Sequence, residues 1–341
     1  MNRFIKKLLI LIIVPILPII LLELLISNQR QAIFEEIAFE KNYSQDAASY
    51  KWIEILDNDS INILAGSSSV RYGLSCKELN KLSTDNSIYV NIAMDARDPI
   101  QTYFILKNLK LGSIRNIYFG LDPWIYTKKY YKYRNRYLYL DFTILEFLQY
   151  FQEHDKSTFI ERYKALFKYI LNSSQKKHVE NFITPEDFGS VALHRTAINF
   201  NNLSDSYQLE KYDWSNLQFE YLKKIESLCE VNKIKFCLFI PPKRSDYTQH
   251  FKNSYQEVLK EYNIKIAQNE IISPIFSKLD ILDKQGDSTL FAEAFHLNEK
   301  GQIKFSKLFH ELSIKQMEEY SIDYNWFEVD RAESNDNIYI K

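Results

Sequence analysis

Residues 61–73 read INILAGSSSVRYG, a short apolar run that ends in a glycine and three serines. A run of this length bounded by turn residues is typical of a buried strand, and serine often caps a following helix. We therefore predict a strand at Ile61–Ala65, a sharp turn at Gly66 and a helix that begins close to Ser68. In open α/β sheets ligands bind at the carboxyl ends of the strands, where this turn would place the Ser68 hydroxyl.

Short apolar runs and longer helical patterns continue to alternate along the chain, which predicts a parallel sheet. Further strands are expected at Ser87–Ala93, Asn116–Gly120 and Lys235–Ile240, with a fifth near Ile264–Ala267. Helices are expected from Asp98–Pro99 to about Lys110, around Leu217–Leu228 and after Asn298. The predicted fold class is α/β: a three-layer α/β/α, doubly wound parallel sheet of the flavodoxin-like kind, with a helical insertion and an N-terminal transmembrane helix.

The amino terminus carries an apolar run of 19 residues, Leu8–Ile26, with a single charge at Glu23. As a helix this run would span roughly 28 Å, about one hydrocarbon core. Basic residues precede it and few follow, so we expect an uncleaved, single-pass anchor at residues 1–27 in the cytoplasmic (inner) membrane. The amino terminus would lie in the cytoplasm and the body outside it, in the periplasm or at the cell surface. A cleaved signal peptide and a buried core helix are the alternatives.

The rest of the chain divides by composition and pattern. We expect a connector at 28–59, the α/β domain at 60–123 and 214–318, a helical, aromatic-rich insertion at 124–213 and a tail at 319–341. From Met317 onward the chain is expected to be extended. The insertion begins with a stretch at 126–137 that is rich in tyrosine, lysine and arginine. Such a stretch suits an anionic or carbohydrate partner, and a solvated helix or loop is the alternative.

The composition excludes several classes of protein. The 341 residues include 43 basic and 44 acidic side chains, a formal net charge of −1, so no nucleic-acid partner is expected. Three cysteines are too few, and odd in number, for a disulfide framework. Because the sequence has no glycine-rich phosphate loop, no CxxC pair and no HExxH motif, we expect no cofactor and no metal. Only 7 glycines occur, and four of them lie in the stretches 61–73, 116–120 and 291–301: Gly66, Gly73, Gly120 and Gly301.

A second motif lies near the carboxyl end, where residues 291–301 read FAEAFHLNEKG. Glu293 stands three residues before His296, so its carboxylate can reach the imidazole Nδ1–H within one turn and leave Nε2 as a base. With Ser68 these residues would form a nucleophile, a base and an orienting acid. A buried histidine that is paired to Glu293 only for structure is the alternative.

The two motifs, and the order of elements between them, resemble the SGNH (GDSL-type) hydrolase superfamily. More narrowly the chain is similar to its membrane-anchored, extracytoplasmic branch, which includes the D-alanyl-lipoteichoic acid protein and the alginate-acetylation proteins. The resemblance covers about residues 59–318 without the insertion. It implies that Ser68 is the nucleophile and His296 the base, with Glu293 in the place of the usual aspartate.

The resemblance also implies where an oxyanion would bind. The donors in the family are the N–H of the nucleophile, a glycine N–H in a second block and an asparagine side chain in a third. Here the second block begins at Asn91 and has Ala96 in the place of the glycine, while the third block has Asp122 in the place of the asparagine. An ionised carboxylate cannot donate, so Asp122 could instead bind a substrate hydroxyl or amine. The expected oxyanion or substrate-binding residues are Ala96, Asp122, Asn91 and Gly66.

The expected function is that of an extracytoplasmic serine esterase or O-acyltransferase. The resemblance implies an O-acetylated or otherwise acylated cell-envelope polysaccharide or teichoic-type polymer as substrate, and a membrane-bound O-acyltransferase as partner. One alternative is a non-catalytic envelope protein that binds glycan or docks the transferase, which Asp122 and the missing second-block glycine favour. Another is that the basic tyrosine stretch lies on anionic lipid.

Overall fold

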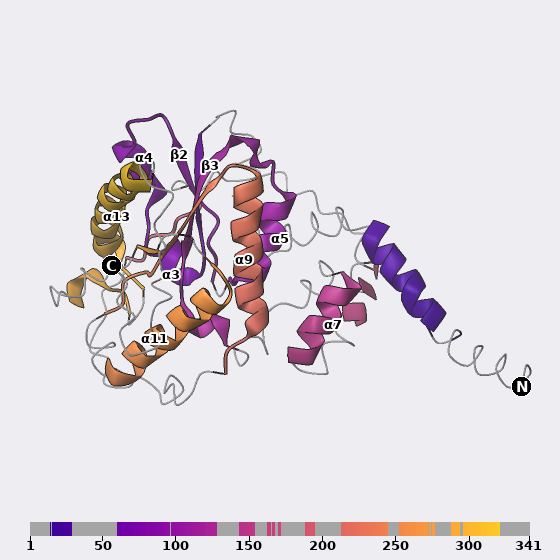
Figure 1. The fold of residues 1–341 in the computed structure, drawn as a ribbon. Helices are drawn as coiled ribbons and strands as arrows, with labels where there is room; N and C mark the ends of the chain where they lie inside the picture. The colour runs from indigo at the N-terminus through magenta and orange to yellow at the C-terminus, as the bar shows by residue number, and fades with distance from the viewer. Residues whose placement is uncertain are drawn as a thin grey trace, which may run out of the picture.

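A parallel five-stranded sheet lies at the centre of the computed structural model (Figure 1). Its strands are β1 (Ile61–Ala65), β2 (Ile88–Asn91), β3 (Ile114–Gly120), β4 (Lys235–Phe239) and β5 (Ile275–Phe276). They are arranged in the order β2-β1-β3-β4-β5, and every neighbouring pair is parallel. The order reverses between β1 and β3, which is the switch point at which sheets of this order bind ligands.

The structure describes the following parts of the chain, and the remaining residues lie outside its description. The described residues are 14, 16–28, 60–95, 97–127, 143–153, 162–164, 166–167, 170–171, 188–194, 213–244, 252–271, 273, 275–276, 288–293 and 296–320. Several expected features lie outside these residues. They are the first part of the apolar run, the connector from residue 29, nearly all of the basic tyrosine stretch, Ala96 and the tail from residue 321.

Helices cover both faces of the sheet. On one face α5 (Pro99–Asn108), α9 (Asn216–Val231) and α11 (Lys252–Gln268) share an apolar cluster with the strands. On the other face α3 (Ser68–Arg71), α4 (Cys76–Leu82) and α13 (Glu299–Tyr320) share a second cluster. Figure 1 shows α4 and α13 on one side of the strands and α5 and α9 on the other. The predicted α/β class with a parallel sheet is therefore confirmed.

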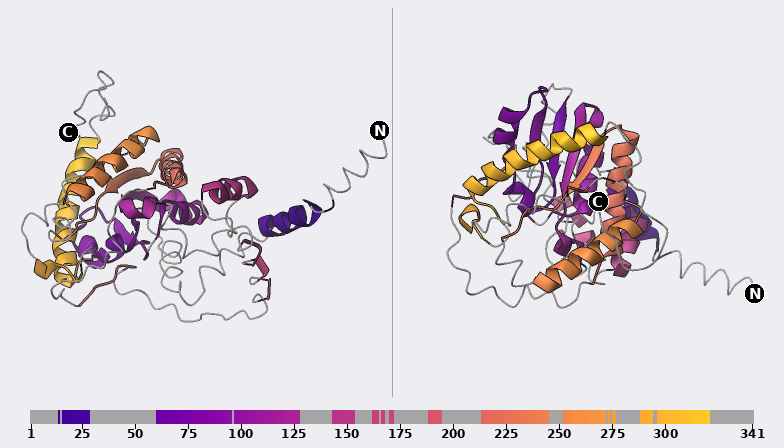
Figure 2. Two further views of the ribbon diagram at one scale, coloured as in Figure 1. Left: turned by 90° about the horizontal axis from the view of Figure 1, so that it is seen from below. Right: turned by 60° about the vertical axis from the view of Figure 1, so that its left-hand side comes forward.

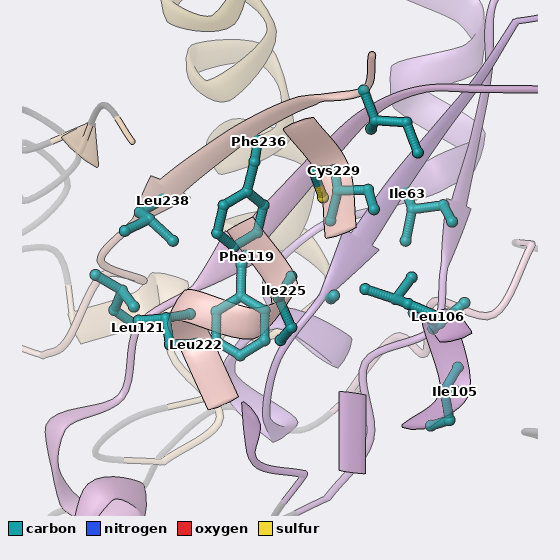
Figure 3. Close-up of a cluster of buried hydrophobic side chains, with 14 of the residues drawn as sticks. Ile63, Ile105, Leu106, Phe119, Leu121, Leu222, Ile225, Cys229, Phe236 and Leu238 are labelled. Carbon is teal, nitrogen blue, oxygen red and sulfur yellow. The ribbon is translucent and has the colours of Figure 1, made fainter. Parts of the chain in front are cut away.

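Side chains of the central strands alternate between these two clusters. Ile63 of β1 and Phe119 of β3 belong to the first cluster, whereas their neighbours Leu64 and Tyr118 belong to the second. Figure 3 shows the first cluster, in which Phe119 and Phe236 lie close to side chains of α9. Because both faces are covered, every residue of β1 is buried, and this explains the nearly continuous apolar run of its sequence.

The expected start of α5 is confirmed. The side chain of Asp98 accepts a hydrogen bond from the Gln101 N–H at 2.8 Å, and the Gln101 side chain accepts one from the Asp98 N–H at 3.3 Å. Pro99 occupies the first turn of the helix. This capping box satisfies two N–H groups at the helix start and fixes the point where the loop after β2 ends.

Two expectations about secondary structure are wrong. Residues Ile264–Ala267, expected to be a strand, lie within α11, where Tyr262 and Ile266 at helical spacing pack into the first apolar cluster. The fifth strand is instead Ile275–Phe276, which is too short to produce a recognisable pattern. Helix α13 continues beyond Met317, so the chain there is helical rather than extended.

The segment between β3 and α9 contacts the α/β domain at several places. An isolated antiparallel bridge between Thr127 and Trp214 joins its two ends. Helix α7 (Ile144–Glu153) packs against α9. Further along, the carbonyl oxygen of Phe188 accepts a hydrogen bond from the Asn91 N–H at 2.9 Å, at the end of β2. Residues 188–194 thus lie against the domain that carries the sheet.

Residues 16–28 are helical and are bonded to the same segment. Glu23 accepts hydrogen bonds from Arg162 Nε at 2.8 Å, from Arg162 Nη2 and from the Tyr163 hydroxyl at 3.1 Å. The Arg162 side chain is completely buried and lies 4.9 Å from the centre of the Phe147 ring of α7. Figure 2 shows this N-terminal helix at the end of the molecule away from α13. Among the described residues, no helix is both long enough and apolar enough to cross a membrane.

Candidate active site

The turn between β1 and α3 carries Ser68 at the carboxyl edge of the sheet. Ser67 caps α3, because its Oγ accepts a hydrogen bond from the Ser69 N–H at 3.3 Å. Gly66 has a φ of +135°, and a Cβ at this residue would lie 2.9 Å from the carbonyl oxygen of Gly120. Residues with a side chain rarely adopt this backbone conformation. Glycine is therefore required for the chain to turn this sharply against the end of β3.

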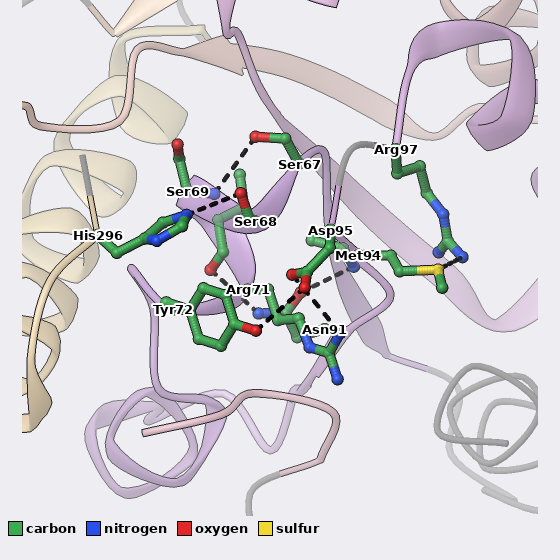
Figure 4. Close-up of polar contacts among 12 residues, drawn as sticks. Ser67, Ser68, Ser69, Arg71, Tyr72, Asn91, Met94, Asp95, Arg97 and His296 are labelled. Atoms are coloured by element: carbon green, nitrogen blue, oxygen red, sulfur yellow. Dashed lines mark hydrogen bonds and ion pairs between the residues drawn. The ribbon is translucent and has the colours of Figure 1, made fainter. Parts of the chain in front are cut away.

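The structure brings the three expected catalytic residues together. Ser68 Oγ lies 2.8 Å from His296 Nε2, and His296 Nδ1 lies 2.7 Å from Glu293 Oε1. Figure 4 marks the bond between Ser68 and His296 with a dashed line. Both distances are typical of hydrogen bonds, so one continuous line of bonds joins the hydroxyl, the imidazole and the carboxylate. The tautomer that fits donates from Nδ1–H to Glu293 and accepts the Ser68 hydroxyl proton at Nε2.

The loop that carries His296 is fixed on several sides. The Ala292 N–H donates to the carbonyl oxygen of His296 at 2.9 Å, and an isolated antiparallel bridge pairs Phe291 with Leu297. Immediately after the loop, the side chain of Asn298 caps α13. The ring of Tyr72, at the end of α3, meets the imidazole edge-on with 4.9 Å between the ring centres. These contacts hold the imidazole in one orientation toward the turn.

The charged groups around His296 determine its protonation state. Burial lowers the pKa of His296; the hydrogen bond to Glu293 and its charge raise it, the charge of Lys243 lowers it, and that of Asp122 raises it. The resulting pKa lies below the ordinary value of 6.5. The imidazole is therefore mostly neutral at pH 7, and Nε2 can accept a proton.

The carboxylate of Asp122 is fully buried and is bonded within the protein. Its Oδ2 accepts hydrogen bonds from the hydroxyls of Ser67 and, at 2.7 Å, Ser69, while Oδ1 lies 2.7 Å from Lys243 Nζ. Lys243 also donates to Ser69 Oγ at 2.8 Å. Burial raises the pKa of Asp122, but the ammonium and the hydroxyls outweigh it and hold the pKa below its ordinary value. Asp122 thus faces groups of its own chain, and the geometry gives no support to its expected role as a substrate ligand.

Asn91, the first residue of the second block, also has partners within the protein. Its Oδ1 accepts from the Ala93 N–H at 2.9 Å, and its Nδ2 donates to the Val70 carbonyl oxygen at 3.3 Å and to Ser190 Oγ at 3.2 Å. These bonds connect the end of β2 to α3 and to the segment before α9. The structure therefore gives Asn91 a positioning role in the fold, whereas Ala96, at the other end of the block, lies outside the described residues.

The resemblance implies three oxyanion donors. Among the described residues, the group at these positions that can donate to an oxyanion is the backbone N–H of Ser68. Within the described part of the chain it donates to no acceptor, so it can donate a hydrogen bond to the oxygen of a bound carbonyl group.

The described residues include no group of three or more histidine, cysteine, aspartate or glutamate side chains that could hold a metal ion.

Lys243 is the residue of this site that the sequence pattern did not reveal. It follows β4 after two prolines, while Asp122 follows β3, and these strands are neighbours in which Gly120 pairs with Phe239. An acid and a base placed after neighbouring parallel strands meet at the same edge of the sheet. That signal is present in the sequence, but it can be read only when the strand order is known.

The chemistry that these residues can support follows from their arrangement. A neutral imidazole that accepts the proton of a serine hydroxyl, and that is oriented by a carboxylate, activates the hydroxyl as a nucleophile.

No protein-family model matches this chain, and no curated protein matches it either. A functional assignment therefore depends on these residues and their geometry.

Proposed function

We propose that this chain is an extracytoplasmic serine acyl-transfer enzyme of the SGNH type, with Ser68, His296 and Glu293 as its catalytic residues. One observation carries the proposal, namely the line of two hydrogen bonds, 2.8 and 2.7 Å long, that runs from the hydroxyl through the imidazole to the carboxylate. It joins residues 228 positions apart in the sequence. A histidine paired to glutamate only for structure would not need a serine hydroxyl at its second nitrogen.

In the first half of the proposed reaction, His296 Nε2 takes the proton of Ser68 as Oγ attacks the carbonyl carbon of an ester. The carbonyl oxygen becomes an oxyanion, which the Ser68 N–H can stabilise. Glu293 holds the imidazole in place and stabilises the imidazolium that forms. The imidazolium then returns its proton to the leaving alkoxide, the bond between carbon and leaving oxygen breaks, and an acyl group remains on Ser68.

In the second half, water or a sugar hydroxyl attacks the acyl group on Ser68. His296 removes the proton of the attacking group and later delivers it to Ser68 Oγ, which leaves as the hydroxyl. Attack by water gives hydrolysis, and attack by a sugar hydroxyl gives transfer. Both outcomes use the same residues.

The proposal includes a location and a substrate class. The strand order β2-β1-β3-β4-β5, with helices on both faces, supports a doubly wound fold of the SGNH type. The apolar run Leu8–Ile26 supports a single-pass anchor with the α/β domain outside the cytoplasm. The resemblance then favours an O-acylated polysaccharide or teichoic-type polymer of the cell envelope as substrate, and a membrane-bound O-acyltransferase as partner.

A covalent probe tests the proposal directly. Full-length protein in detergent micelles is incubated with a fluorophosphonate, and the modified residue is identified by peptide mass spectrometry. We expect modification at Ser68, together with hydrolysis of an aryl acetate that Ser68→Ala abolishes. Ser83→Ala, which changes a serine far from the site, is the matched control and should leave both signals intact. A wild-type protein that neither reacts at Ser68 nor hydrolyses the ester would refute the proposal.

A non-catalytic, glycan-binding or docking protein is the second candidate. The burial of the Asp122 carboxylate favours it, because one of the three oxyanion donors expected from the resemblance is then missing. On this view Ser68→Ala would leave the cellular phenotype of the protein intact, whereas deletions within 124–213 would remove it. The two candidates therefore make opposite predictions for a single serine.

A further inference from the structure

A buried ion pair lies next to the turn that carries the proposed nucleophile. Lys243 and Asp122 lie 2.7 Å apart, and their side chains are 5% and 0% exposed. Between them they bond the hydroxyls of both serines that flank Ser68. Each of the three serines of the turn is thus held by a hydrogen bond, and the outer two are held by the same pair of charges.

Stability alone does not account for such a pair. Removing two charges from water costs about as much as their attraction returns, and a well-packed apolar pair is often at least as stable. The Lys243–Asp122 pair, however, supplies something that apolar side chains cannot, namely hydrogen bonds that fix the rotation of the two serine hydroxyls. It also places two opposite charges near His296.

We propose that the Lys243–Asp122 pair is a positioning device for the proposed acyl transfer, which holds Ser67 and Ser69 so that Ser68 Oγ stays in line with His296. This inference rests on the proposed function. Neither Lys243 nor Asp122 has to touch the substrate, because both act through the turn and through their charges. In this chain the position of the expected asparagine donor is thereby used to build the turn.

Several charged or titratable groups act on the imidazole and must be considered together. Glu293 bonds to Nδ1, and Tyr72 packs against the imidazole in a T-shaped contact and bonds through its hydroxyl to Asp95. Lys243 lowers and Asp122 raises the pKa of His296. The two charges of the pair have opposite effects on the pKa of His296. Removing one of them should therefore shift the midpoint of the His296 titration, whereas removing both should shift it little.

Titration of the imidazole separates these effects. Full-length protein labelled with ¹³C and ¹⁵N at histidine is titrated by NMR in detergent micelles from about pH 5 to pH 8, the range in which histidine changes charge. His296→Gln identifies the resonance of His296 among the 6 histidines. We expect Lys243→Met to move the midpoint to higher pH, Asp122→Asn to move it to lower pH, and the double variant to remain close to the wild type.

Activity of the double variant tests the positioning. Asp122→Asn with Lys243→Met leaves no isolated buried charge, so it should fold even if a single variant does not. We expect its ester hydrolysis to fall roughly 10²-fold, the loss that a small misplacement of reacting groups can cause, while His296 titrates nearly as in the wild type. Cooperative thermal unfolding confirms that the variant is folded.

The outcomes distinguish this inference from the proposed function. If wild-type protein is neither modified at Ser68 nor able to hydrolyse the ester, the proposed function fails, while the titrations still report on the ion pair. If Ser68 reacts but a folded double variant keeps wild-type activity, the positioning role is refuted and the proposed function stands. Single variants that fold and displace the titration in the same direction, or not at all, would refute the effect of the paired charges.

Discussion

Ser67, Ser68 and Ser69 are adjacent and chemically identical, yet they belong to two different hydrogen-bond systems. Ser68 bonds to His296, whose partner Glu293 has a side chain that is 27% exposed. Ser67 and Ser69 bond instead to Asp122, whose side chain is not exposed at all and is paired with Lys243. One carboxylate is in contact with solvent, and the other is enclosed.

The difference shows that the partners of a serine, and not its position in a motif, determine what it can do. Successive residues at the start of a helix point about 100° apart, so the side chains of one turn reach different surroundings. Ser68 meets a neutral base that can remove its proton, whereas its neighbours meet a carboxylate that is already paired. The first arrangement favours reactivity and the second favours a fixed geometry.

Removing a residue of the hydrogen-bond system of Ser68 and His296 should have the largest effect on activity. We expect Ser68→Ala and His296→Ala each to lower kcat/KM for ester hydrolysis by about 10³-fold or more, because each removes a group that takes part in bond making in the proposed reaction. Stopped-flow or steady-state assays with an aryl acetate measure this loss. His194→Ala is the matched control, because His194 also bonds to a glutamate, Glu299, but its side chain is 76% exposed. Loss of activity in this variant would contradict the assignment.

Removing one serine that bonds the Lys243–Asp122 pair should lower stability and slow the reaction of Ser68 without abolishing it. We expect Ser69→Ala to lower the free energy of unfolding by about 1–3 kcal/mol, because Asp122 and Lys243 each lose a buried hydrogen bond. Fluorophosphonate should still modify Ser68, although more slowly. Chemical denaturation and labelling rates measure the two effects, and Ser68→Ala should show the opposite combination of a small stability change and no labelling.

A change at Gly66 should disturb both systems at once. An alanine Cβ would approach the carbonyl oxygen of Gly120 to 2.9 Å, and the φ of +135° would be strained. We expect Gly66→Ala to lower the free energy of unfolding by about 1–3 kcal/mol and to slow labelling of Ser68. Gly112→Ala is the control, because a Cβ there meets no atom within 4 Å. Equal stability of the two variants would show that the turn tolerates a side chain.

The smallest expected effect is a gradual decline of kcat/KM as the pH falls. The pKa of His296 lies below 6.5, and only the neutral imidazole can accept the Ser68 proton. As pH falls through this pKa the imidazole is protonated, so kcat/KM should decline, and above it kcat/KM should be constant. A pH–rate profile with a single acid limb and a midpoint below 6.5 is the expected result. A midpoint above 6.5 would show that Glu293 outweighs burial.

The sequence was sufficient to predict the strand Ile61–Ala65 to the residue, because buried parallel strands are short apolar runs with clear ends. The sequence motifs also singled out Ser68, Glu293 and His296, whose side chains the structure brings within hydrogen-bond distance of one another. The sequence could not reveal Lys243, which depends on which strands are neighbours. The strand predicted at Ile264–Ala267 was wrong, because the apolar pattern there suits either a strand or a helix and belongs to α11.

The bonds between Glu23 and Arg162 have a practical consequence for anyone who wishes to study the α/β domain alone. Truncation after residue 28 would remove the proposed anchor and is the obvious way to prepare the α/β domain without it. Here it would remove a carboxylate from a guanidinium that is completely buried, and loss of one member of a buried ion pair is strongly destabilising. The N-terminal helix is in this respect a structural element of the folded protein, and shortened forms should retain it or replace Arg162 with an apolar residue.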